Sequence, residues 1–334
     1  MRRLVSVNPQ SLAEAVDRLH TEGASASAVG GGSDLLGMLK DDLVTPDVLV
    51  NLRAIEGDEG LAAIESVAVD TTEDAEVRIG GLVTLTQLSL HPIVVDRYPV
   101  LAEAAKSAAT PQIRNVGTVA GNICQRPWCW YFRQKFPCYK HGGNRCFSRV
   151  GENQFNAILG GGPSFIVHPS DTAPALVALD ARFRVVGPDG ERTVAAADFF
   201  TLPRADLARE NVLEVGEVLV GITLPPAAAR RSTYAKVLDR EAWTHAVVSV
   251  AAVLTMDGDR VRTARVVLGG VAPIPWSVPR VDDLLRGQYM TAALANEAGR
   301  LAVDGAQPLS KNAYKVTLTK NLVRRTLLSL SAQH

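Results

Sequence analysis

Four cysteines are the residues of this chain whose type and spacing most directly suggest chemistry. Cys124, Cys129, Cys138 and Cys146 are the only cysteines among 334 residues, and all fall within one window of 23 residues. Thiolates gathered in this way are typical metal ligands. The intervals lack the C-x-x-C knuckle of common zinc modules, whereas iron–sulfur clusters accept wider loops. The spacing therefore favours an iron–sulfur cluster, with zinc, disulfides and unligated thiols as the alternatives.

Aromatic residues crowd the same window and could shield a cluster from water. They include Trp128, Trp130, Tyr131 and Phe132, and such a shell would also tune a reduction potential. The N-terminus lacks a signal-peptide core, and no apolar run of about 18 residues follows. We therefore expect a cytoplasmic protein without a membrane span, and a reducing cytosol argues against disulfides.

A glycine-rich loop over residues 30–34 follows a short apolar strand and precedes a helical pattern. This arrangement points backbone N–H groups at a phosphate. Leu35 stands where a dinucleotide fingerprint requires glycine, and Met38 stands where a Walker loop requires lysine. The loop alone is therefore either a phosphate cradle or a plain turn.

A second segment rich in hydrogen-bond donors lies over residues 110–122. It strengthens the phosphate-binding interpretation of the first loop, because two such loops suit a diphosphate. Within it Arg114 is a phosphate partner or a solvated surface charge. Further on, Asp171 could accept hydrogen bonds from ribityl or ribose hydroxyls, or cap the helix after it. We interpret His168 as a structural histidine without a role in cofactor binding.

Alternating helical and strand patterns must position these loops. The chain carries 35 basic and 35 acidic residues, so its charge does not argue for nucleic acid or an anionic membrane as a partner. Helices are predicted over 11–22, 84–91, 99–109, 173–179, 279–287, 291–304 and 310–330. Strands are predicted over 26–29, 48–52, 77–81, 165–167, 182–186, 192–194, 217–224, 233–238, 246–256 and 261–268.

These elements predict an α+β protein of two domains. A linker-like run over 225–231 places the boundary near residue 227. The first domain, 1–226, mixes α and β, and the second, 227–334, should combine a three-stranded antiparallel sheet with helices.

In combination these motifs resemble the FAD-binding medium subunits of the molybdenum hydroxylases, the group that includes xanthine dehydrogenase and carbon monoxide dehydrogenase. The resemblance covers nearly the whole chain and rests on the loop 30–35, on 114–122, on Ser170-Asp171 and on 216–219. It implies two α/β subdomains, about 1–55 and 56–226, that hold FAD, with a cysteine-rich insertion at 124–162. The FAD contacts that it implies are Val29, Gly30, Gly31, Gly32, Ser33, Asp34, Leu35, Thr110, Arg114, Asn115, Gly117, Thr118, Gly121, Asn122, Asp171, Leu219 and Lys236.

The cysteine-rich segment looks like an insertion of one branch, which includes 4-hydroxybenzoyl-CoA reductase and bacterial aromatic aldehyde oxidoreductases. In that branch the insertion carries a [4Fe–4S] cluster. Several relatives supply a ligand at the position aligned with Phe165, and phenylalanine cannot ligate iron. We therefore expect either three thiolates, Cys129, Cys138 and Cys146, or Cys124 as the fourth ligand, and favour the latter.

The resemblance implies an electron-transfer role without a catalytic base on this chain. Substrate oxidation would occur at a molybdenum cofactor in a large subunit, with [2Fe–2S] centres in a small one, in a heterotrimer or its dimer. FAD and the [4Fe–4S] cluster would pass electrons to an external acceptor such as a ferredoxin or a quinone. The alternatives are a free-standing FAD-dependent oxidoreductase with its own substrate site and a zinc-stabilised scaffold.

Overall fold

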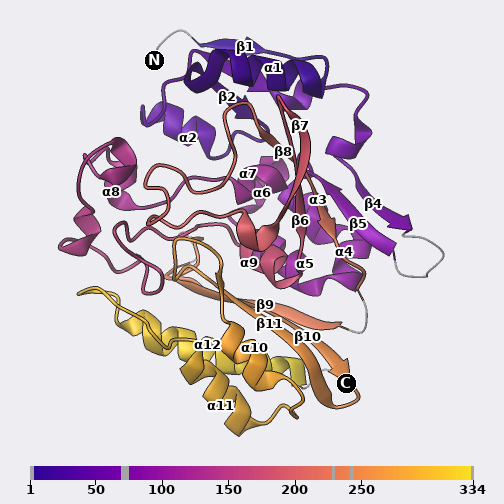
Figure 1. Ribbon diagram of the computed structural model, residues 1–334, viewed down its shortest axis with the longest axis vertical. Coiled ribbons are helices and arrows are strands. Elements are labelled where there is room, and N and C mark those ends of the chain that lie inside the picture. The colour runs from indigo at the N-terminus through magenta and orange to yellow at the C-terminus, as the bar shows by residue number, and fades with distance from the viewer. Residues whose placement is uncertain (1–3, 69–74, 228–229, 241–243, 332–334) are drawn as a thin grey trace.

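Three sheets, one above the other in Figure 1, organise the chain. The computed structural model describes residues 4–68, 75–227, 230–240 and 244–331. Residues 228–229 of the expected linker lie outside this range. The N-terminal sheet lies at the top, a five-stranded sheet at the centre and the C-terminal sheet at the bottom.

The N-terminal sheet is parallel, with strand order β1-β3-β2. Its elements are β1 (Val5–Val7), α1 (Leu12–Glu22), β2 (Ala26–Val29), α2 (Leu35–Lys40) and β3 (Val48–Asn51). The predicted start of α1 is confirmed, because the Ser11 hydroxyl accepts a hydrogen bond from the Glu14 N–H at 3.2 Å.

The central sheet is antiparallel, with strand order β4-β5-β8-β6-β7. Its strands are β4 (Ile64–Ala68), β5 (Ala75–Gly80), β6 (Arg182–Gly187), β7 (Gly190–Ala195) and β8 (Val218–Leu224). The associated helices are α3 (Leu85–Leu90), α4 (Pro92–Arg97), α5 (Pro99–Ser107), α6 (Pro111–Val116), α7 (Val119–Ile123) and α9 (Thr172–Ala178). The largest core cluster lies between these helices and the sheet.

The C-terminal sheet has four antiparallel strands where three were predicted. It contains β9 (Arg230–Val237), β10 (Val248–Asp257), β11 (Arg260–Gly269) and β12 (Trp276–Ser277), followed by α10 (Pro279–Leu285), α11 (Ala292–Leu301) and α12 (Tyr314–Ser331). The additional strand β12 is only two residues long, which is too short to produce a sequence period.

Strand β10 joins two cores. Its residues Val250, Ala252 and Leu254 belong to the C-terminal core, and the intervening Ala251 and Val253 belong to the central one. Successive side chains of a strand point to opposite faces, so the C-terminal sheet is buried between α12 on one face and α5 and α9 on the other. The two predicted domains therefore share a continuous apolar contact.

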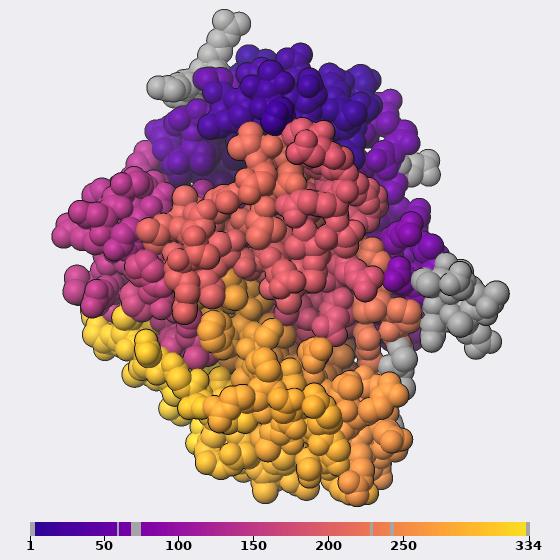
Figure 2. All heavy atoms as spheres, in the orientation of Figure 1, coloured from indigo at the N-terminus to yellow at the C-terminus, as the bar shows by residue number. Residues whose placement is uncertain are grey.

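The cysteine-rich segment forms a lobe at one side of the molecule, around α8 (Trp130–Arg133) (Figures 1 and 2). It reaches the C-terminal domain, where the Lys311 N–H donates to Asn153 Oδ1 at 2.9 Å and the Tyr314 hydroxyl donates to the Gln154 carbonyl at 2.9 Å. The predicted strand over 165–167 is wrong: this segment forms no ladder, although its residues alternate between buried and partly buried as in a strand. Within the described residues, no helix is both long and apolar enough to cross a bilayer.

Candidate cofactor sites

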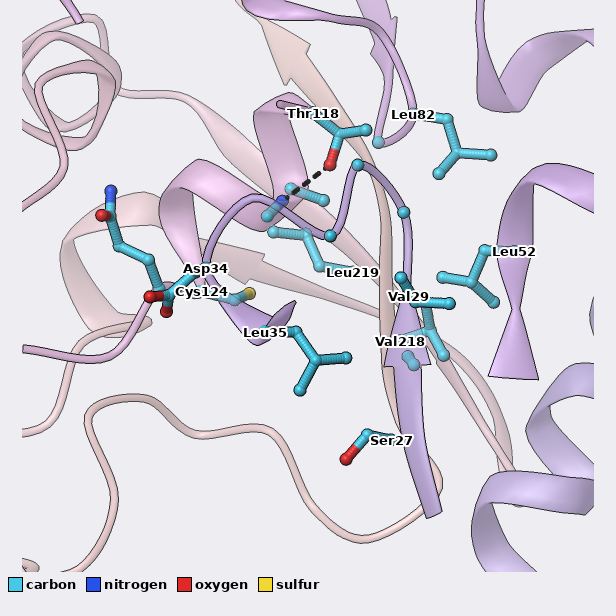
Figure 3. A pocket seen from close by; sticks show the side chains of 18 of the residues that line it. Ser27, Val29, Asp34, Leu35, Leu52, Leu82, Thr118, Cys124, Val218 and Leu219 are labelled. Carbon is cyan, nitrogen blue, oxygen red and sulfur yellow. Dashed lines mark hydrogen bonds between the residues drawn. The ribbon is translucent and has the colours of Figure 1, made fainter. Parts of the chain in front are cut away.

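The glycine loop lies at the carboxyl end of β2 and lines a cavity of about 340 Å³ between the N-terminal and central sheets (Figure 3). A Cβ on Gly31 would lie 1.9 Å from the Val116 carbonyl oxygen, and Gly32 has a φ of 69°. The first position therefore needs glycine for close backbone approach, and the second favours it for its conformation. The loop packs directly on the 110–122 segment, as a joint diphosphate site would require.

The second segment consists of two short helices rather than one open loop. Pro111 occupies the first turn of α6, where a missing N–H costs nothing, and Thr118 caps α7. The Thr118 hydroxyl accepts a hydrogen bond from the Gly121 N–H at 3.1 Å, which Figure 3 marks with a dashed line. This cap holds the turn at Gly117 against the glycine loop.

Ten of the expected FAD contacts line this cavity. They are Val29, Gly30, Gly31, Gly32, Ser33, Asp34, Leu35, Thr118, Gly121 and Leu219. Thr110, Arg114, Asn115, Gly117, Asn122, Asp171 and Lys236 do not line it. Several apolar residues also line the cavity, among them Leu52, Leu82 and Val218. The sequence does not reveal them, because an isolated leucine or valine carries no signal that separates a binding wall from ordinary core.

Polar residues of the second segment make contacts within the protein. The Arg114 guanidinium donates to the carbonyls of Ala108 and Ala109 at 2.8 and 2.9 Å, so it is not a freely solvated charge. Asn115 Oδ1 accepts from the Thr86 hydroxyl at 2.7 Å.

Asn122 connects α7 to the start of α9. Its Oδ1 accepts from the Ser170 and Thr172 hydroxyls, each at 2.6 Å. Nearby, burial lowers the pKa of His168 to about 4, so this histidine is neutral at pH 7. Its ring packs edge-on against Phe200, which fits the structural role expected for it.

Asp171 joins the central and C-terminal sheets. Its carboxylate accepts from the Tyr234 hydroxyl and from Lys236 Nζ, each at 2.7 Å, and Lys236 also donates to the Ser107 carbonyl at 2.9 Å. Burial raises the pKa of Asp171, and the Lys236 ammonium opposes that rise. The helix-capping alternative is wrong, because the Ser170 hydroxyl accepts from the Ala173 N–H in place of the Asp171 carboxylate.

Asp34 connects the glycine loop to the cysteine-rich lobe. Its two carboxylate oxygens accept from the Arg126 N–H at 2.9 Å and from Arg133 Nη2 at 2.8 Å. Arg133 also donates to the carbonyls of Pro127 and Arg126, and its guanidinium lies 4.2 Å from the Trp128 ring centroid. Because this ion pair is largely buried and charge-assisted, it fixes the glycine loop against the cysteine-rich lobe.

The structure groups three of the four cysteines. Cys129, Cys138 and Cys146 line one small cavity inside the lobe, whereas Cys124 lines the larger cavity beside the glycine loop (Figure 3). Cys124 caps the C-terminus of α7, which directs it to the loop, and burial raises the pKa of its thiol to about 12. Cys124, the favoured fourth ligand, therefore lines a different cavity from the other three cysteines.

The small cavity has a mixed wall. Tyr131, Phe132 and Phe147 supply aromatic surface, and the Sγ of Cys146 lies 2.9 Å from the Ser148 hydroxyl oxygen. Lys140 also lines it, with a side chain 1% exposed that pairs with Glu210 at 2.7 Å. Within the described ranges, no group of three or more His, Cys, Asp or Glu side chains is arranged to hold a single metal ion. A cubane cluster differs from a single ion in that each thiolate binds its own iron atom.

Comparison with known proteins identifies the class to which the large cavity belongs. Residues 2–227 match the family model of the FAD binding domain in molybdopterin dehydrogenase, and residues 233–330 match that of the CO dehydrogenase flavoprotein C-terminal domain. The chain is thus an FAD-binding flavoprotein of the molybdenum-containing oxidoreductases.

Individual relatives agree with this class. The aldehyde oxidoreductase FAD-binding subunit PaoB of Escherichia coli K12 is 35% identical over 92% of both chains. The carbon monoxide dehydrogenase medium chain of Hydrogenophaga pseudoflava is 30% identical over 96% of this chain and 94% of its own. A solved structure of carbon monoxide dehydrogenase from that organism superposes with a TM-score of 0.77 and 27% identity over 99% and 98% of the two chains. The chain therefore belongs to the family of FAD-binding medium subunits of the molybdenum hydroxylases.

Proposed function

We propose that this chain is the electron-transfer subunit of a cytoplasmic molybdenum hydroxylase complex and carries a [4Fe–4S] cluster in addition to FAD. Its partners would be a large molybdenum-cofactor subunit and a small [2Fe–2S] subunit, in a heterotrimer or its dimer. The acceptor would be a one-electron carrier such as a ferredoxin, or a quinone. The observation that carries the proposal is the Asp34–Arg133 pair, which joins the glycine-loop cavity to α8 of the cysteine-rich lobe.

The residues of the large cavity fit FAD. Two backbones meet there without intervening side chains, as the Gly31–Val116 approach requires, so main-chain N–H groups are available to a diphosphate. Apolar walls from Leu52, Leu82 and Leu219 suit the remaining surface of a cofactor. Bound FAD supplies exchange between one-electron and two-electron carriers. The chain would hold and orient it through residues 1–226, closed by the C-terminal domain 227–334.

The residues outside that cavity would complete the site. Asp171 and Lys236 form a buried ion pair at the contact between the domains, and we assign them to the flavin end of the cofactor. Thr110, Arg114, Asn115, Gly117 and Asn122 would position the walls through the hydrogen bonds and packing that surround α6 and α7. Their role is to orient the cofactor, and no proton transfer is required of them.

The small cavity fits three positions of a cluster. Cys129, Cys138 and Cys146 are close enough that ionisation of the second and third raises the pKa of the first, after the larger effect of burial. Thiolates bound to iron would lose this mutual repulsion. The insertion 124–162 would thus extend the electron path to the surface of the lobe.

One preparation tests the proposal. The chain co-expressed with its neighbouring reading frames and purified without oxygen should show a flavin spectrum, about four iron and four sulfide per chain beyond those of the small subunit, and both partners. A chain that instead turns over a substrate by itself would support the free-standing oxidoreductase. Flavin without the additional iron would refute the cluster and leave the FAD subunit standing.

A further inference from the structure

We propose that Ser164 supplies the fourth ligand of the cluster, through its hydroxyl oxygen, giving a site of three cysteines and one serine. The inference rests on the proposed cluster. It concerns a residue that neither the spacing of the cysteines nor the family motifs single out.

The first observation is the placement of the segment that follows the cysteines. Ser164 and Ile166 line the small cavity together with Cys129, Cys138 and Cys146. Phe165 does not line it: a Cβ built on Gly161 would lie 2.6 Å from the Phe165 ring. Side chains alternate in extended backbone, so the segment presents residues 164 and 166 to the cysteines and turns residue 165 away.

The second observation is the state of the Ser164 hydroxyl. Ser164 is 3% exposed, yet no partner for its hydroxyl is found in the described part of the chain, and its hydrogen bonding is confined to the backbone carbonyl, which accepts from the Gly162 N–H at 3.1 Å. The oxygen is not among the fully buried side-chain atoms that lack a hydrogen bond in the described residues, so it keeps accessible surface, and the residue lines the small cavity. A hydroxyl oxygen in this position can bond to a ligand held in that cavity.

Ser148 is the other serine at the same cavity, and its hydroxyl is already engaged. Its oxygen lies 2.9 Å from Cys146 Sγ, so it is already hydrogen-bonded to a cluster thiol. A hydrogen bond to a ligating sulfur tunes the potential of a cluster without replacing a ligand. Ile166 has no donor atom, and Lys140 is paired with Glu210. Of the two serines of this wall, Ser164 is therefore the one whose hydroxyl is free to bind iron.

Ligation would balance simply: an Fe–O bond forms, and the hydroxyl proton passes to water. An alkoxide is a harder ligand than a thiolate. The iron atom at Ser164 should thus be the most easily lost of the four, and the reduction potential should be lower than that of an all-cysteine cluster.

The test compares three variants in the co-expressed complex, namely Ser164→Ala, Ser164→Cys and the matched control Ser148→Ala. After mild oxidation, Ser164→Ala should retain about three of four irons and show the electron paramagnetic resonance signal of a [3Fe–4S] centre, with FAD content unchanged. Ser164→Cys should keep all four irons, lose iron more slowly than the wild type and have a higher midpoint potential. Ser148→Ala should keep four irons.

Two results would overturn the inference alone: a Ser164→Ala cluster with the iron content, spectrum and potential of the wild type, or loss of iron in Ser164→Ala that Ser164→Cys fails to restore. A wild-type complex that binds FAD but lacks the additional iron would overturn the proposed cluster itself, and the inference with it. The experiment therefore distinguishes a failure of the serine ligand from a failure of the proposed cluster.

Discussion

Asp171 and Lys236 form an ion pair with 2.7 Å between the carboxylate and the ammonium, and each side chain is 5% exposed. The carboxylate precedes α9 in the central domain, and the ammonium comes from β9 of the C-terminal sheet. Both charges lose water on folding, and each depends on the other for compensation. The pair therefore helps to fix the orientation of the two domains, and the same two residues are the ones assigned to the flavin.

Breaking this pair should destabilise the apoprotein. Lys236→Met leaves the Asp171 charge buried without its partner, and we expect the free energy of unfolding to fall by about 3 kcal/mol. Urea unfolding, monitored by near-UV circular dichroism, measures the change in the free energy of unfolding. The control Lys311→Met removes the partner of Glu152 in an exposed pair and should cost less than about 1 kcal/mol. Equal losses in the two variants would contradict this account.

The close approach of the two loops should make FAD binding sensitive to one methyl group. Gly31→Ala places a Cβ against the Val116 carbonyl and must push the loops apart, so we expect FAD to bind at least about tenfold more weakly, or about 1.4 kcal/mol. Flavin titration of apoprotein measures the affinity. Gly37→Ala is the matched control, because nothing lies within 4 Å of a Cβ at that position of α2. Unchanged affinity in Gly31→Ala would remove the loop from the site.

The separation of the cysteines gives opposite expectations for two variants. Cys129→Ala should lose the cluster and keep FAD, whereas Cys124→Ala should keep the cluster, because Cys124 lines the other cavity. Iron and sulfide analysis with a visible spectrum distinguishes them. Loss of iron in Cys124→Ala would restore Cys124 as a ligand, which the family resemblance and the phenylalanine at position 165 favoured.

The link between the glycine loop and the lobe should couple the retention of both cofactors. Arg133→Met removes the guanidinium that holds Asp34, and we expect flavin and iron to be released faster by several-fold each. Release rates in the presence of a flavin trap and an iron chelator measure this. Lys135→Met on the same lobe breaks only the exposed pair with Asp42 and should leave both rates unchanged.

Asp282 should make stability depend on pH. Burial raises its pKa to about 6, above its usual value, while its carboxylate accepts from the Val266 N–H at 2.8 Å. The folded state therefore binds the additional proton between about pH 4 and pH 6, and this residue lowers stability as the pH rises through that window. Asp282→Asn keeps an acceptor oxygen and should stabilise the protein by about 1 to 2 kcal/mol at pH 8, with little change at pH 4.

An exposed aspartate of the same domain supplies the control for that titration. Asp304 pairs with Arg280 at the surface, and both side chains are more than half exposed, so Asp304→Asn should show no such pH dependence. Urea midpoints at pH 4, 6 and 8 test both variants. A gain in Asp282→Asn that is constant across this range would show that the buried charge is not the cause.

Local signals in the sequence determined the elements around the first loop. Ser11 and Glu14 predicted the start of α1, and Gly23, with a φ of 55°, predicted its end, because caps depend on neighbours within a few residues. The glycine run predicted a backbone contact, and the Cβ clash at Gly31 supplies its reason. In the same way the ordered motifs along the chain predicted the family, and the matches to both domains confirm it.

Tertiary structure decided which distant residues meet. Cys124 and Cys129 are five residues apart, yet the end of α7 directs one to the glycine loop and the turn before α8 directs the other to the lobe. Asp171 and Lys236 are separated by 65 residues and meet only because β9 packs beside the central domain. Sequence distance does not encode side-chain direction across a fold, so the sequence by itself determined which residue types could bind cofactors, and packing determined which of them share a site.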